Sequence, residues 1–150
     1  MISTEPFLRI HADLADALEI GQTPAGERRM IGILGGRVEG PRLKGRILPG
    51  GADWQTVRAD GVADIRARYA IEASSGARIL VTSEGLRHGP AEVMARLRAG
   101  ETVDPTLYYF RTVMRFETPD PGFAWLNRIL ALARGERLAN AVRLAVHEIH

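Results

Sequence analysis

Asp53 and Trp54 are the two adjacent residues of this chain whose types and spacing best suit chemistry. They follow the corner Pro49-Gly50-Gly51, so a carboxyl group stands beside an indole at the start of an extended segment. Burial against an apolar ring raises the pKa of a carboxyl group and so suits it to general acid–base catalysis near neutral pH. The alternative is structural, with Asp53 capping the glycine corner and Trp54 packing in the core.

A second set of polar side chains lies on one predicted strand, residues 106–117. Tyr109, Arg111 and Glu117 occupy alternate positions, so all three point to the same face. Inside a barrel this row would read a ligand, whereas on the outside it would be a solvated charged surface. The residues alone leave both alternatives open.

A similar row is formed by Arg66, Arg68 and Glu72, with Tyr69 on the opposite face. Strand periodicity separates the two faces of this segment. It does not decide which face is inward.

Several classes of site are excluded by residue type. The chain has no cysteine, which excludes disulfides, thiol catalysis and cysteine-ligated zinc. The four histidines are not spaced for chelation, no glycine-rich loop precedes a capped helix, and no serine has a nucleophile-elbow context. We therefore expect no metal and no cofactor.

The charge balance argues against a nucleic-acid partner. The net charge is only +2, because 20 basic residues face 18 acidic ones, and acids recur between the bases along the chain. No apolar run approaches the roughly 20 residues of a membrane helix, and residues 1–16 do not resemble a secretory signal. We expect a cytoplasmic protein without a membrane partner.

Extended segments and tight turns dominate the first half of the chain. Glycines at Gly35-Gly36 and Gly50-Gly51 mark bends of the kind that curl a sheet toward closure, and Asp60-Gly61 favours a hairpin. We expect a polar break at 19–24. Strands are expected at 6–14, 27–38, 42–47, 54–58, 62–72, 77–83 and 106–117. The pattern predicts one mainly β domain over residues 1–150, an antiparallel, calycin-like barrel of about eight to ten strands.

One helix is predicted near residues 90–99, where the hydrophobic period changes. Pro90 stands at its start, Glu92 in its first turn, and Gly100 after its end. Its apolar stripe is expected to cover the sheet or one end of the barrel. Residues 123–134 satisfy a helical count, but strands are favoured there, with 135–137 as the turn of a final hairpin.

The chain resembles the DUF3237 family, also called the UPF0311 proteins. The resemblance lies in ordered segments from a quarter of the way along to near the C-terminus. These are Gly35–Pro41, Gly50–Trp54 with Asp60-Gly61, Tyr109–Thr112, Phe116–Thr118 and Trp125–Asn127. It implies an antiparallel barrel with a central cavity, commonly assembled into homo-oligomers such as trimers. It also implies similarity to fungal cyclases that add a hydroxyl oxygen across a carbon–carbon double bond without a cofactor.

Residue roles follow from this resemblance. It implies that Asp53 and Glu117 transfer protons and that Arg111, with Tyr109, stabilises a developing phenolate or enolate. Trp54 and Trp125 would be cavity walls, and Tyr69 is placed among the substrate-binding residues. The catalytic prediction is thus Asp53, Arg111 and Glu117, and the substrate-binding prediction is Trp54, Tyr69, Tyr109 and Trp125.

The expected function is therefore that of a cofactor-independent lyase or cyclase for a small hydroxylated aromatic or polyketide-like substrate. Two alternatives remain, a non-catalytic barrel that binds a small hydrophobic ligand and a structural oligomer without a ligand. The three differ in whether ionisable groups converge on an interior void.

Overall fold

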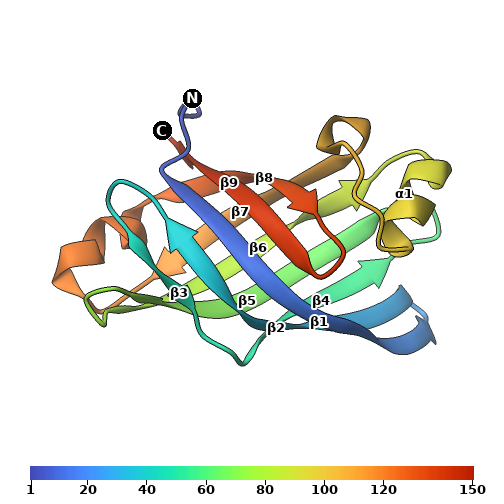
Figure 1. The fold of residues 1–150 in the computed structure, drawn as a ribbon, viewed down its shortest axis with the longest axis horizontal. Coiled ribbons are helices and arrows are strands. Elements are labelled where there is room, and N and C mark those ends of the chain that lie inside the picture. The colour runs from blue at the N-terminus through green and yellow to red at the C-terminus, as the bar shows by residue number, and fades with distance from the viewer.

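The chain folds into nine antiparallel strands, one α-helix and two 3₁₀ segments (Figure 1). The computed structural model describes residues 1–150. The strands are β1 (Leu8–Thr23), β2 (Gly26–Glu39), β3 (Lys44–Ile47), β4 (Gly51–Val57), β5 (Ala63–Ala73), β6 (Arg78–His88), β7 (Tyr109–Glu117), β8 (Leu130–Arg137) and β9 (Ala141–Ile149). The helical segments are α1 (Ala91–Arg98), η1 (Pro105–Leu107) and η2 (Pro121–Arg128).

The sheet closes on itself, as the predicted barrel requires. Strand order is β1-β9-β8-β7-β6-β5-β3-β2-β4, and β1 also pairs with β2 while β5 also pairs with β4. Because β3 and β4 occupy the same position between β2 and β5, the nine strands form a closed eight-stranded barrel with one extra strand. Closure leaves few unpaired strand edges. None of the helical segments is long and apolar enough to cross a bilayer.

Bends near the first glycine corner let the long β1–β2 ribbon wrap around the core. The pairing of β1 with β2 shifts register between Asp13 and Ala17, which marks bulges. Just before these shifts, Gly36 pairs with Ala12; it has a φ of 145°, and a Cβ there would collide with the carbonyl of His11. A side chain at this position is therefore excluded by both backbone conformation and contact.

Alternate residues of each strand fill the barrel. On β5, Ile65, Ala67, Tyr69 and Ile71 are buried in turn, and the residues between them are exposed or half-buried. A cluster of 23 buried apolar residues occupies most of the interior. A second cluster of seven packs beneath α1, which contributes Val93 and Leu97. The barrel is thus filled along most of its length, and space for a ligand has to be found near α1.

Most predicted elements are confirmed, including the helix near 90–99, which spans Ala91–Arg98 with Pro90 as its N-cap. The predicted break at 19–24 is wrong, because β1 continues to Thr23. Its last residues are mostly polar, with Ile20 as the exception, and the end of the β1–β2 hairpin is largely exposed. The strand expected from 106 begins only at Tyr109, after the 3₁₀ turn η1.

The C-terminal region contains both a helical segment and a strand, the two structures considered for residues 123–134. Pro121–Arg128 forms the 3₁₀ segment η2, and the strand favoured for this region begins only at Leu130. The predicted turn at 135–137 is wrong, since these residues belong to β8 and the chain turns at 138–140. Gly135 is accommodated in the strand because its hydrogen faces the ring of Phe110, where a Cβ would not fit.

Candidate functional site

Strand β4 directs its odd-numbered residues into the barrel. Asp53 pairs with Ile31 of β2 and with Ala67 of β5, and Gln55 pairs with Arg29 and Ile65. Directly opposed residues of a sheet project to the same face. The side chains of Asp53, Gln55 and Arg29 therefore lie on the inner face.

Asp53, Gln55 and Arg29 form a hydrogen-bonded chain. Nε of Arg29 donates to Oε1 of Gln55 over 2.8 Å, and Nε2 of Gln55 donates to Oδ2 of Asp53 over 2.7 Å. The guanidinium can only donate, so the orientation of the Gln55 amide is set by its two neighbours. Oδ1 of Asp53 is buried and has no hydrogen-bond partner. One oxygen of the carboxyl group is thus held, and the other is free.

The surroundings of Asp53 favour its protonated form. Burial raises the pKa of Asp53 above its ordinary value of 3.8, while the hydrogen bond from Gln55, the charge of Arg87, the backbone N–H of Arg66 and the charge of Arg29 oppose that shift. The desolvation effect is the larger one. The carboxyl group is therefore suited to hold a proton at a higher pH than an exposed aspartate would.

Arg87 is the second unusual group of the interior. It is only 5% exposed, it takes part in no ion pair within 4.0 Å, and its guanidinium makes no hydrogen bond to the protein. Its guanidinium lies over the ring of Phe110, whose centroid is 5.4 Å from Cζ. Burial, with the positive charges of Arg137 and Arg29, lowers the pKa of Arg87 to about 10. It remains a cation at neutral pH.

Arg137 completes the group at the end of β8. Its backbone N–H donates to Oη of Tyr108 over 2.9 Å, and its Nη1 donates to the carbonyl of Ala141 over 3.2 Å. Burial lowers the pKa of Arg137, and the charge of Arg29 acts in the same direction. Three guanidinium groups thus lie close enough to influence one another electrostatically at this end of the barrel.

These guanidinium groups line a pocket of about 240 Å³ at the α1 end. Its inner wall is formed by Arg29, Arg87, Arg137 and Ile31, and Met94 and Leu97 of α1 contribute further apolar surface. Asp53 is the direct cross-strand neighbour of Ile31, so it lies beside a lining residue without being part of the lining itself. The pocket is therefore apolar over part of its wall and strongly basic over the rest.

The structure does not bring the predicted catalytic residues together. Arg111 and Glu117 lie on the outer face of β7, whose inward residues are Phe110, Thr112, Met114 and Phe116. Arg111 lines an outer groove that also contains Arg9 and Arg134, and Glu117 lines another. Only Asp53 of the three faces the interior, because the even-numbered side of β7 is the apolar one.

The predicted substrate-binding residues are also divided between the two faces. Tyr109 is 45% exposed and stacks on His88, with ring centroids 4.9 Å apart. Tyr69 points inward, but it lies within the large apolar cluster, and its Oη is buried without a hydrogen-bond partner. It is therefore close to the interior but not part of the pocket lining.

Neither tryptophan is a wall of this pocket. Trp54 is 50% exposed on the outer face, in a cross-strand row with Met30 and Leu18. Trp125 lies on η2, at the end of the barrel opposite α1 (Figure 1), where it packs edge-on against Phe7 with centroids 5.7 Å apart. The exposed apolar row around Trp54 is compatible with the expected homo-oligomer, which stays a prediction.

Arg29, Gln55, Arg87 and Arg137 are residues of the pocket region that the sequence analysis did not single out. Alternation alone places Gln55 on the same face as Asp53. The buried series Ile79, Val81 and Ser83 of β6 leads by the same period to Arg87. No signal of this kind identified Arg137, because its segment was assigned to a turn. The structure contains no group of three His, Cys, Asp or Glu side chains arranged to hold a metal ion.

Fold and site together define a closed antiparallel β-barrel with a small basic pocket at one end. The family model described as "Protein of unknown function (DUF3237)" matches residues 2–149. The chain belongs to this family, as the resemblance predicted.

Relatives of nearly equal length support this assignment. A UPF0311 protein of Bradyrhizobium diazoefficiens is 41% identical over 148 residues, which cover 99% of this chain and 97% of the relative. The crystal structure of a conserved protein of unknown function from Rhodopseudomonas palustris has a TM-score of 0.93 at 39% identity, covering 100% of this chain and 98% of that one. A β-barrel-like protein from Acinetobacter baumannii has a TM-score of 0.86 at 43% identity, with coverage of 100% and 97%.

A more distant neighbour is an enzyme from the fungus Penicillium herquei. Its crystal structure has a TM-score of 0.64 at 24% identity, and the match covers 96% of each chain. At this level of identity the likeness shows that the two proteins share a fold. The same fold thus occurs in an enzyme and in bacterial proteins of unknown function.

Proposed function

We propose that this protein is a small-molecule lyase or cyclase in which Asp53 transfers the proton. The observation that carries the proposal is the buried Asp53 carboxyl group, held at Oδ2 by Gln55 and free at Oδ1, beside a pocket. Support from outside the site is limited to the fold shared with a fungal enzyme. The reaction class is addition of a hydroxyl oxygen to a carbon–carbon double bond.

The proton balance of such an addition requires only one carboxyl group. Protonated Asp53 donates its proton to one alkene carbon, and the hydroxyl oxygen forms a bond to the other carbon. The hydroxyl proton then returns to the Asp53 carboxylate, so the product is an isomer of the substrate. A general acid acts directly or through one water molecule, which suits a group beside the pocket lining.

The size of the pocket limits the substrate. An engineered protein cavity of about 150 Å³ accepts benzene, and the pocket beneath α1 has about 240 Å³. A single aromatic ring with a short side chain is therefore the substrate class that fits best. The pocket can also orient the two reacting groups, a contribution of roughly 7–11 kcal/mol when alignment is good.

The test uses 2-prenylphenol and 3-prenyl-4-hydroxybenzoate, which close to dimethylchromans by this reaction. In D₂O the enzyme is expected to place a single deuterium on the carbon that receives the proton, as read by NMR. Asp53→Asn should keep the fold and bind the same compounds but slow turnover by about 100-fold or more, the scale of general acid–base contributions.

Asp64→Asn is the matched control, because Asp64 is a carboxylate on the neighbouring strand that pairs with Arg66 at 3.5 Å. It should leave turnover unchanged. Equal turnover in Asp53→Asn and the parent protein would remove Asp53 from the mechanism. Binding of both compounds without cyclisation would instead identify a non-catalytic ligand-binding barrel.

A further inference from the structure

The guanidinium of Arg87 lacks a counter-charge within contact distance, although it lies in the interior. Asp53 is the only carboxylate whose charge stabilises the Arg87 cation, and Asp53 is itself held by Gln55 rather than by Arg87. An exposed cation would be solvated by water, whereas a buried one without a partner loses several kcal/mol of solvation free energy. The contact with Phe110 supplies a cation–π interaction but no hydrogen-bond acceptor.

The inner part of the pocket therefore carries an excess of positive charge. Arg29, Arg87 and Arg137 face it, and Asp53 is the one acid beneath them. Arg29 is bound to Gln55, and one Nη of Arg137 is bound to a backbone carbonyl. Arg87 thus has all five of its side-chain N–H bonds free of protein acceptors.

Three more charged residues lie at the mouth. Asp16 and Glu19 of β1 and Arg98 of α1 line the pocket and are exposed. Neither carboxylate makes an ion pair with the inner arginines within 4.0 Å. The excess positive charge is therefore confined to the desolvated inner wall, where electrostatic interactions are strongest.

We infer that the pocket binds a small organic carboxylate whose charged group is held by Arg87 and Arg137 and whose body lies against Ile31, Met94 and Leu97. A guanidinium fork matches a carboxylate in geometry and charge, and both partners are then satisfied where water is excluded. The apolar part of the lining favours a carboxylate with a ring or short hydrocarbon body over an inorganic anion. This inference names the substrate class of the site proposed above and so rests on that proposed function.

The primary test compares 4-hydroxybenzoate with 4-hydroxybenzamide, a neutral analogue of nearly the same shape, by isothermal titration calorimetry at pH 7.5. The carboxylate is expected to bind the parent protein at least about tenfold more tightly, the scale of a buried hydrogen bond to a charged group. This comparison needs no variant. Equal affinities for the two compounds, or no saturable binding of the carboxylate, would overturn the inference.

Two variants locate the contact. Arg87→Met and Arg137→Met should each weaken binding of 4-hydroxybenzoate by about tenfold or more. Arg134→Met is the control, because Arg134 lies on the same strand as Arg137 but on the exposed outer face, and it should change the affinity less than about twofold. Thermal melting verifies that each variant is folded. The same affinity in Arg87→Met, Arg137→Met and Arg134→Met would refute the assignment.

Two further measurements distinguish an organic ligand from an inorganic anion, and failure of this inference from failure of the proposed mechanism. Inorganic phosphate should compete poorly with 4-hydroxybenzoate, and competition at equal concentration would overturn the assignment of an organic ligand. Asp53→Asn should bind the carboxylate at least as tightly as the parent protein, because an asparagine next to the site can never carry a negative charge that would repel the ligand. A binding site that persists in Asp53→Asn while turnover is unaffected would leave this inference standing and refute only the proposed mechanism.

Discussion

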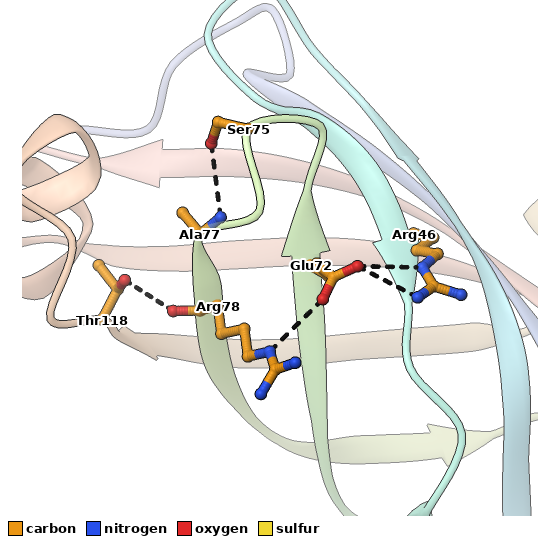
Figure 2. A network of polar contacts seen from close by, with 6 residues as sticks. All are labelled: Arg46, Glu72, Ser75, Ala77, Arg78 and Thr118. Carbon is orange, nitrogen blue, oxygen red and sulfur yellow. Dashed lines mark hydrogen bonds and ion pairs between the residues drawn. The ribbon is translucent and has the colours of Figure 1, made fainter.

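Arginines on the outer face near the β5–β6 turn differ from those beneath α1 in their partners. Glu72 lies between Arg46 and Arg78, with N–O distances of 3.1 Å and 3.4 Å (Figure 2). Arg87 lies on the same strand as Arg78, but its side chain points inward and meets no carboxylate within 4.0 Å. The exposed arginines are thus paired with a carboxylate although water already screens their charge. The buried Arg87 has no carboxylate partner, although an ion pair would stabilise a buried charge the most.

This difference in partners indicates a structural role for the outer arginines and a functional role for Arg87. Exposed ion pairs contribute little to stability, because solvent screens them and the side chains lose entropy on pairing. A buried cation without a partner is costly, and apolar residues of similar size commonly replace such groups without loss of stability. An unpaired Arg87 in the pocket, despite its loss of solvation free energy, supports the binding of a ligand that supplies the missing negative charge.

The largest effect on stability is expected from Arg87→Met. Removal of the desolvated charge, with nearly the same side-chain volume, should raise the free energy of unfolding of the ligand-free protein by about 1–3 kcal/mol. Urea denaturation measures this change, and Arg134→Met should stay within about 0.5 kcal/mol of the parent. A loss of stability in Arg87→Met would mean that the cation–π contact with Phe110 outweighs desolvation.

An intermediate effect is expected from the ionisation of Asp53, which makes the free energy of unfolding depend on pH. Because the folded state raises the pKa of this group, its protonation stabilises the fold below pH 3.8, and that contribution is lost as the pH rises through the folded-state value. The unfolding free energy of the parent, minus that of Asp53→Asn, should therefore fall as the pH rises above 3.8. Each unit of pKa shift corresponds to about 1.4 kcal/mol of this difference. A difference that rises with pH over this window would show that the arginines outweigh burial.

The smallest effect is expected from Glu72→Gln on the outer face. Hydrogen bonds from Arg46 and Arg78 lower the pKa of Glu72, but the contact lies at the surface, where the side chain keeps part of its exposure to water. The melting temperature should shift less than in Arg87→Met, and the shift should vanish in 1 M salt, where screening acts over about 3 Å. A large decrease in melting temperature that does not depend on salt would show that the contact of Glu72 with Arg46 and Arg78 is a structural element rather than a surface contact.

Much of the fold could be predicted from local signals in the sequence. Asp60-Gly61 does join consecutive strands, and the change of hydrophobic period does mark α1. The extent of β1 could not be predicted in this way, because its last residues form a ribbon whose two faces are both largely exposed. Such a segment lacks the alternation on which strand prediction depends.

The site was predicted only in part, for a related reason. Strand periodicity correctly grouped Tyr109, Arg111 and Glu117 on one face, but it could not say that this face is the outer one. The inward side of β7 carries Phe110 and Met114, so apolar burial would have decided the question. Arg87 and Arg137 were missed because the predicted strand ended at residue 83 and residues 135–137 were assigned to a turn, whereas both arginines lie on strands. Only the closed barrel places these two beside one pocket.

The amide of Gln55 has a consequence for stereochemistry. It occupies Oδ2 of Asp53 and is itself fixed by Arg29, so the carboxyl group cannot exchange its two oxygens by rotation without breaking that bond. Under the proposed reaction, every proton would leave from the same point in space. A planar double bond lying in the pocket would be approached from one side only, and with the prenyl compounds in D₂O the deuterium would occupy only one of the two hydrogen positions on the carbon that receives it.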